Sequence, residues 1–179
     1  MKSKGRSPLI FGVRRRPGKR SQGILSLGGL NWPCALGKGG ISALKREGDG
    51  ATPLARMRVL GGYCRTDGVA LRKSVLPLRA IGRDLGWCDA PADRNYNRPV
   101  TLPYPASHER MRREDRLYDI CLVLDWNIAP RRRNRGSAIF LHLARPGYPP
   151  TEGCIALSPR DMARLLPLLS TRSFVQVMR

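Results

Sequence analysis

The segment HLARPGYPPTEGCIALS, residues 142–158, joins two apolar stretches through a loop rich in proline and glycine. The stretch before it, SAIFLH (137–142), and the stretch CIAL (154–157) are short and apolar, which is typical of buried strands. Proline and glycine at this density exclude a regular element between them. Two buried strands joined in this way bring their ends together. We therefore expect His142 and Cys154 to lie side by side.

That juxtaposition would suit thiol chemistry. A free cysteine has a pKa of about 8.5 and is mostly protonated at neutral pH. A neighbouring imidazole can take the proton, and the sulfur can then attack a carbonyl carbon. Gly153 allows the backbone to bend so that amides near the sulfur point at a developing oxyanion. The segment thus predicts Cys154 as nucleophile and His142 as base, with Gly153 shaping the site.

The other four cysteines do not form a recognisable chemical motif. Cys34, Cys64, Cys88 and Cys121 lie far apart in the sequence, and there is no CxxC pair or Cys/His cluster. The sequence therefore indicates neither a disulfide framework nor a metal site, and we expect no cofactor. The alternative for Cys154 is a buried structural thiol beside a core histidine.

Most of the remaining chain predicts strands and turns. Short apolar runs alternate with Gly, Pro, Asn and Asp, which indicates a mainly β fold. The predicted strands are 8–14, 23–27, 31–36, 56–60, 75–80, 118–125, 137–142, 154–157 and 173–178. A helix is predicted over 158–169, with Ser158 as N-cap and Asp161 completing a capping box. Pro167 should kink or shorten it. A second, weaker helix is predicted over 106–115, and a long loop over 82–105.

Charge limits the class of partner. The chain has 33 Lys and Arg against 13 Asp and Glu, a formal charge of +20. Such a balance favours anionic partners, and basic clusters lie in residues 1–20 and at 131–135. One alternative function is therefore a non-enzymatic module that binds nucleic acid or another anionic polymer. Aromatic residues are not interleaved with these clusters as base-stacking platforms would be.

No apolar run reaches the roughly 20 residues of a membrane span. The only apolar run near the N-terminus is PLIFGV, which is shorter than a signal-peptide core. From these two observations we expect a cytoplasmic protein without a membrane span. The sequence does not indicate an oligomeric state.

The 142–158 segment resembles the signature of the L,D-transpeptidase catalytic domain, also called the YkuD domain. In that signature a histidine precedes a loop that ends in Ser/Thr-His-Gly-Cys. His142, Thr151, Gly153 and Cys154 match it. Upstream, KREGDGATPLARMRV (45–59) is similar to a Gly-x-x-x-Thr-Pro segment of the same domain. The resemblance implies a β-sandwich of mixed sheets over residues 8–179, with one short C-terminal helix and a long loop excursion. Residues 1–7 would form a basic tail.

The resemblance also implies an activity and a substrate. Members of the family act on peptidoglycan stem tetrapeptides, usually in the periplasm or cell envelope. Cys154 would attack a peptide carbonyl and hold the acyl group as a thioester. Transfer to an amine would give a cross-link, as in an L,D-transpeptidase, whereas transfer to water would trim the tetrapeptide to a tripeptide. The alternative is therefore a cytoplasmic L,D-carboxypeptidase that acts on recycled peptides. Another alternative is a catalytically inactive relative.

Two residues depart from the family signature and bear on substrate binding. Glu152 stands where the signature has its second histidine, and Ala156 replaces an arginine. We expect Arg145 or Arg98 to supply the missing positive charge, with Thr151 and Glu152 beside the nucleophile. Polar and aromatic residues in and after the long loop are predicted to line a peptide groove: Trp87, Asp89, Tyr96, Asn97, Arg98 and His108. His108 is also an alternative base.

Overall fold

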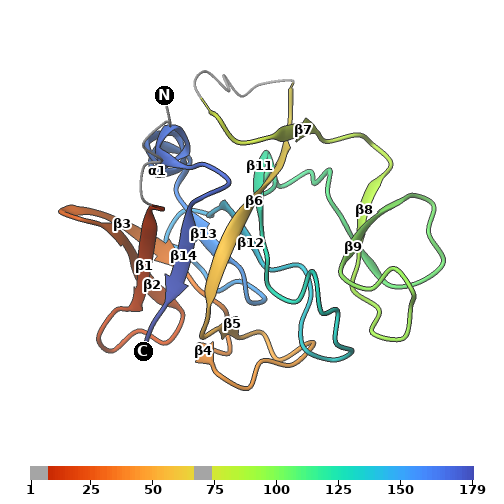
Figure 1. The fold of residues 1–179 in the computed structure, drawn as a ribbon, viewed down its shortest axis with the longest axis horizontal. Coiled ribbons are helices and arrows are strands. Elements are labelled where there is room, and N and C mark those ends of the chain that lie inside the picture. The colour runs from red at the N-terminus through yellow and green to blue at the C-terminus, as the bar shows by residue number, and fades with distance from the viewer. Residues whose placement is uncertain (1–7, 67–73) are drawn as a thin grey trace, which may run out of the picture.

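A computed structural model describes residues 8–66 and 74–179. The predicted basic tail, residues 1–7, lies outside the described residues. The fold is mainly β, as predicted (Figure 1). Its strands are β1 (Ile10–Arg15), β2 (Gln22–Leu27), β3 (Leu30–Ala35), β4 (Ile41–Ser42), β5 (Thr52–Pro53), β6 (Arg56–Cys64), β7 (Leu78–Ala80), β8 (Leu85–Cys88), β9 (Arg98–Thr101), β10 (His108–Arg110), β11 (Ile120–Leu124), β12 (Phe140–Leu143), β13 (Ile155–Leu157) and β14 (Phe174–Val177).

The main sheet closes on itself. Its strand order is β11-β12-β13-β3-β2-β1-β14-β6-β7, and β6 also pairs with β11. Antiparallel pairs dominate, but β1 with β14, β12 with β13 and β6 with β7 are parallel. The predicted architecture of mixed β-sheets is therefore confirmed. Because the pairing of β6 with β11 returns the sheet to its first strand, one apolar interior is enclosed.

Alternation along the strands separates that interior from a second core. Leu141 and Leu143 of β12 and Ile155 and Leu157 of β13 belong to the enclosed core. Phe140 and Cys154 belong to a second cluster on the outer face of the same strands. Both faces of β11, β12 and β13 are thus buried, which explains why their sequences read as continuous apolar runs.

The excursion after β7 covers this outer face. In Figure 1 the strands β8 and β9 stand to the right of the main sheet, apart from β1 and β2 on the left. Trp87 from β8 packs edge-on against Phe140, with ring centroids 5.1 Å apart. The predicted excursion is confirmed, but residues 82–105 are not one irregular loop, since they contain two strands of a three-stranded sheet.

The helix predicted over 106–115 is wrong. Residues 108–110 form β10, which pairs antiparallel with β8, and the following residues make turns. The sequence ASHERMRRED has helix-forming residues, but pairing with β8 and burial of Met111 against the outer face decide its conformation. Tertiary contacts override a weak local propensity here.

The C-terminal helix forms as predicted. Helix α1 (Pro159–Leu165) begins after Ser158, whose hydroxyl accepts a hydrogen bond from the Asp161 amide at 3.1 Å. Past Leu165 the chain continues as the 3-10 helix η1 (Leu166–Leu168), which contains Pro167. Proline lacks the amide N–H that would extend an α-helix, so the end of α1 at Leu165 follows from the sequence. In the part of the chain that the structure describes, no helix has the length and apolarity needed to cross a membrane.

Replacing Leu141 by alanine tests how strongly the enclosed core holds the site strand. Leu141 is fully buried between two residues that face the opposite side. We expect Leu141→Ala to lower the free energy of unfolding by about 2–5 kcal/mol, because it leaves a cavity in a packed core. Leu44, which is 72% exposed, provides the control. Leu44→Ala should change stability by less than about 0.5 kcal/mol in the same urea titration.

Candidate active site

The parallel pair β12–β13 carries both residues that the sequence singled out. His142 lies opposite Ala156 in the register, so Cys154 is two positions away along the same outer face. The side chains of His142 and Cys154 both line one cavity of about 540 Å³, here called the Cys154 cavity. Both residues are largely buried, with 5% and 6% of their surface exposed. The structure thus brings the two side chains to one cavity.

The sulfur of Cys154 is held by backbone groups. Its thiol donates to the carbonyl oxygen of Ala138 at 3.1 Å, and the amide of Phe140 donates to the sulfur at 3.4 Å. Burial raises the pKa of Cys154 to about 12, although the Phe140 amide acts in the opposite direction. The resting residue is therefore a neutral thiol whose proton is bonded to a main-chain carbonyl.

The carbonyl that accepts this proton is itself fixed by the excursion. Ala138 has φ of +52°, a left-handed conformation that is uncommon for alanine. Its amide donates to Asn97 Oδ1 at 3.0 Å, and Trp87 Nε1 donates to the same oxygen at 3.0 Å. Asn97 also donates to the carbonyl of Trp126. A buried polar chain therefore connects Trp87 and Asn97 to the peptide that holds Cys154.

His142 is oriented for one tautomer. Its Nδ1 lies 2.8 Å from the carbonyl oxygen of Leu143. Because a carbonyl only accepts, Nδ1 carries the proton and Nε2 keeps its lone pair. Burial lowers the pKa of His142 to about 4, so the ring is neutral at pH 7. Among the described residues His142 makes no hydrogen bond to Cys154, and each of the two side chains is bonded to the main chain instead.

The loop before Cys154 is shaped by Gly153 and Thr151. Gly153 has φ of +130°, and a Cβ there would lie 2.8 Å from the carbonyl oxygen of Ala51. Only glycine suits that position. Thr151 Oγ1 donates to the Cys154 carbonyl at 2.7 Å and accepts from the Gly153 amide at 3.2 Å. Glu152 is turned outward and forms an exposed ion pair with Lys38 at 2.8 Å, which contributes little stability.

One wall of the cavity carries positive charge. Arg113 and Arg145 both bind Asp115, at 2.6 and 2.8 Å. The two guanidinium groups hold the pKa of Asp115 well below its usual range. Arg113 also lies 5.0 Å above the ring of Tyr118, and that ring meets the His142 ring edge-on at 5.1 Å. Arg145, which the sequence proposed for substrate charge, therefore stands at the cavity beside the histidine.

Other predicted binding residues lie elsewhere. Trp87, Asn97 and Arg98 line a second cavity of about 630 Å³, bounded by Tyr63 and here called the Tyr63 cavity. The Tyr96 hydroxyl donates to Glu47. The remaining candidate, His108, has Nδ1 2.7 Å from the carbonyl of Ala106 and its ring beside Tyr104.

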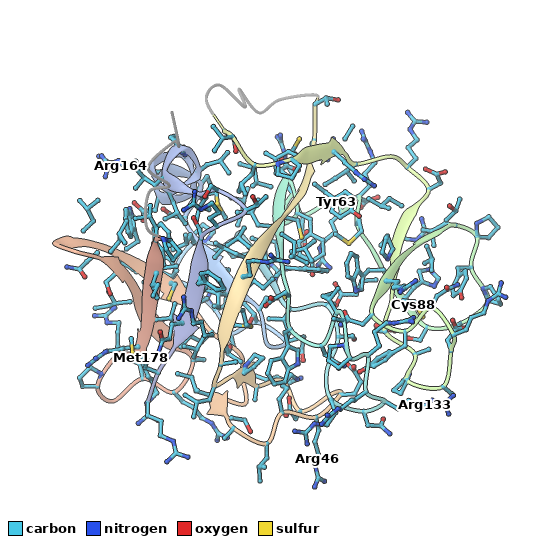
Figure 2. The ribbon with its side chains drawn as sticks, viewed as in Figure 1. Arg46, Tyr63, Cys88, Arg133, Arg164 and Met178 are labelled. Atoms are coloured by element: carbon cyan, nitrogen blue, oxygen red, sulfur yellow. The ribbon has the colours of Figure 1, made fainter. Side chains whose placement is uncertain are left out.

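Figure 2 shows how the labelled side chains are spread over the fold. Cys88 lies within the excursion, and Tyr63 lies near the upper end of β6. Arg46 and Arg133 project outward at the lower edge. The loops that carry these two arginines are joined by the Glu47 amide, which donates to the Asn134 carbonyl at 3.1 Å. The second basic cluster, 131–135, therefore borders a loop that lines the Cys154 cavity.

Several cavity residues were not anticipated from the sequence. These are Lys45, Glu47, Glu109, Arg113, Tyr118 and Ser137. Glu47 lies in the upstream segment 45–59 that resembles the family, but the resemblance of this segment rests on its Thr-Pro pair and does not point to Glu47. Tyr118 and Glu109 have no local motif, because the long-range pairing of β10, which contains Glu109, and of β11, which follows Tyr118, brings them to the cavity.

Comparison with models of known protein families identifies the family of the chain. The model of the L,D-transpeptidase catalytic domain family, YkuD, matches residues 26–177. The match covers most of the chain, so the protein belongs to this family. No curated protein matches its sequence significantly.

Two solved structures are similar to the chain. One is an L,D-transpeptidase from Mycobacterium smegmatis, with 16% identity and a TM-score of 0.43, and the similarity covers 97% of this chain and 59% of that one. The other is Mycobacterium tuberculosis L,D-transpeptidase 1, with 16% identity and a TM-score of 0.39, covering 95% and 61%. The chain therefore spans about three fifths of the length of these two proteins.

The pKa of Cys154 predicts how the free protein reacts with iodoacetamide. With a pKa of about 12, the thiolate fraction at pH 7 is on the order of a thousandfold below that of a free cysteine. We expect the alkylation rate of Cys154 to rise about tenfold per pH unit from pH 7 to 10, because thiolate is the reacting form. Peptide mass spectrometry would follow each cysteine. Cys34, whose pKa is also raised to about 12 but which lies in the enclosed core, is the internal control. A rate plateau below pH 8 would instead indicate a preformed thiolate–imidazolium pair.

Proposed function

We propose that this protein is a cysteine-dependent acyltransferase that acts on peptidoglycan stem tetrapeptides, with Cys154 as nucleophile and His142 as base. One observation carries the proposal: a histidine with a free Nε2 and a cysteine share the outer face of one parallel strand pair and line one cavity. Family membership supports the reaction class.

The chemistry begins from a neutral pair. The thiol leaves the Ala138 carbonyl and turns toward His142 Nε2, which takes its proton as the sulfur attacks the substrate carbonyl carbon. Because burial raises the pKa of Cys154 and lowers that of His142, proton transfer accompanies attack. The Phe140 amide, which already points at the sulfur, stabilises negative charge that develops there.

The tetrahedral adduct then collapses. The peptide C–N bond breaks, the leaving D-amino acid takes the proton from His142, and a thioester remains on Cys154. An acceptor with a nucleophilic N–H or O–H attacks the thioester, His142 again takes the proton, and the thiol is restored. An amine acceptor gives transpeptidation, whereas water gives carboxypeptidation, and both use the same thioester.

Substrate binding draws on the charged wall and the loop before the nucleophile. Arg145 is about half exposed and uses one nitrogen for Asp115, which leaves other N–H groups for a substrate carboxylate. Arg145 thus offers the charge that the family arginine would supply at Ala156. Thr151 and Glu152, which come shortly before Cys154 in the chain, also line the cavity.

Intact-protein mass spectrometry with a disaccharide-tetrapeptide tests the proposed function. We expect a covalent acyl adduct on the wild type, and products that identify water or amine as acceptor. Cys154→Ala should abolish the adduct, because it removes the attacking sulfur. Cys88→Ala is the matched control and should keep it, since Cys88 lies in β8 and does not line the cavity. Equal turnover in Cys154→Ala and wild type would refute the proposal.

Steady-state kinetics can distinguish Arg145 from Arg98 as the residue that binds the substrate carboxylate. Arg145→Ala should raise KM for the tetrapeptide about tenfold or more, because a charged hydrogen bond to a carboxylate is lost. Arg98→Ala, at the Tyr63 cavity, should leave KM within about twofold. Steady-state release of the D-amino acid measures both. The reverse pattern would move the carboxylate site to the Tyr63 cavity.

A further inference from the structure

Six arginines lie on three loops, residues 43–51, 89–97 and 125–139, that hydrogen bonds hold together. The Glu47 amide donates to the Asn134 carbonyl at 3.1 Å, which joins the first loop to the third. Arg131 Nη1 donates to the Arg94 carbonyl at 3.1 Å, which joins the third loop to the second. We call these six residues the arginine edge: Arg46, Arg94, Arg131, Arg132, Arg133 and Arg135.

The protein does not neutralise the positive charge of the arginine edge. Five of its six members are exposed, and Arg131 is partly buried. Within residues 8–66 and 74–179 none of the six forms an ion pair with a carboxylate. Figure 2 shows Arg46 and Arg133 projecting outward. Like charges on adjoining loops repel one another, and an anionic partner would offset that repulsion.

The carboxylates of the same loops are bound to other groups. Glu47 accepts a hydrogen bond from a tyrosine hydroxyl, and Asp49 pairs with Lys45. Asp93 accepts from the Tyr104 hydroxyl at 2.7 Å. These three acids therefore leave the guanidinium groups of the arginine edge available for a ligand from outside the chain.

The turn that carries four of the arginines has a fixed backbone. Asn127 Nδ2 donates to the carbonyls of Arg132 and Gly136 at 3.0 and 2.9 Å, and Asn127 Oδ1 accepts from the Arg132 amide at 2.8 Å. Trp126 Nε1 donates to the Arg135 carbonyl at 2.8 Å. The guanidinium groups take no part in these bonds. Because the main chain is already ordered, a ligand of this turn meets a smaller entropic cost on binding.

The residue types in these loops favour phosphate groups in a chain without bases. Guanidinium donates two parallel N–H groups to one phosphate. Platforms for stacked bases are missing from the three loops, since Tyr96 is buried and Trp126 packs against the enclosed core. Leu44 is the one large apolar side chain of these loops that is well exposed, which is too little apolar surface for insertion into lipid.

A chain with its charges in the backbone also suits the edge better than a polycarboxylate. Each carboxylate of an acidic polypeptide lies on a flexible side chain, and every contact would immobilise that side chain at an entropic cost. A phosphodiester carries its charge in the repeating backbone unit. Six cations spread over three joined loops can therefore contact successive phosphates of one strand.

We propose that the arginine edge binds a linear phosphodiester polymer that lacks bases. The edge adjoins the Cys154 cavity, because its first loop supplies Lys45, Glu47 and Gly48 to the cavity lining and its third loop supplies Ser137 and Ala138. A polymer bound to the edge lies beside the cavity. The interaction goes beyond acyl transfer and does not depend on it, so binding alone tests it.

Fluorescence anisotropy of a dye-labelled glycerol phosphate oligomer measures this binding. Arg46→Gln combined with Arg133→Gln should weaken binding about tenfold or more, because two phosphate contacts are lost. The same loss should lower the steepness of log Kd against log salt concentration by about two. Both side chains are exposed and form no ion pair, so we expect thermal unfolding to stay as in the wild type.

The matched control removes the same charge from the opposite side of the molecule. Arg160 and Arg164 are exposed on α1, and Figure 2 shows Arg164 at the upper left, far from Arg46 and Arg133. Arg160→Gln with Arg164→Gln should keep Kd within about twofold at about 0.15 M salt, where screening acts over about 8 Å. Equal weakening by the two pairs would mean that net charge alone attracts the oligomer, and would overturn the proposal.

Three further probes test the kind of polymer. Oligothymidylate with the same number of phosphates should bind no more tightly than the glycerol phosphate oligomer, and polyglutamate should bind more weakly. Tighter binding of oligothymidylate would assign the edge to nucleic acid, and polyglutamate of equal affinity would remove the preference for phosphate. Phosphatidylglycerol vesicles that bind more tightly than the oligomer at equal phosphate concentration would assign the edge to a lipid surface. Each of these three results would contradict the proposal.

Discussion

The parallel pairing of β12 with β13 is the constraint on which the site depends. Because side chains alternate along a strand, this register puts His142 and Cys154 on one face and Leu141, Ile155 and Leu157 on the other. A shift of one residue would turn the histidine or the sulfur into the enclosed core. The apolar residues that stabilise the closed sheet therefore also fix the positions of the His142 and Cys154 side chains.

The excursion between β7 and β10 contacts the peptide group beside Cys154 through Asn97. Asn97 is bonded to Trp87, to Ala138 and to the Trp126 carbonyl, and Ala138 accepts the thiol proton of Cys154. Buried polar networks of this kind rigidify a structure when every member is satisfied. The long segment between β7 and β10 is thus a cover for the outer core, and its Asn97 supports the peptide group that accepts a hydrogen bond from the Cys154 thiol.

The charged side chains that line the cavity are of both signs, whereas the chain as a whole is strongly basic. The chain carries a formal charge of +20, yet the cavity is lined by Arg113 and Arg145 and also by the carboxylates of Glu47, Asp89 and Glu109. Burial keeps both Cys154 and His142 neutral at rest. The neutral resting state of the thiol is a consequence of this low-dielectric cavity.

The sequence by itself determined the features that depend on neighbouring residues. The apolar runs predicted β11, β12 and β13, and Ser158 and Pro167 predicted where the helix begins and ends. The proline-glycine loop between two apolar strands indicated that His142 and Cys154 lie close together. The tertiary structure decided the rest. Residues 106–115 read as helical but contain a strand, because β8 offers hydrogen bonds and an apolar surface. Asn97, Glu109 and Tyr118 reach the site through contacts with residues distant in sequence, and no local pattern encodes such contacts, since they exist only once the strands have paired.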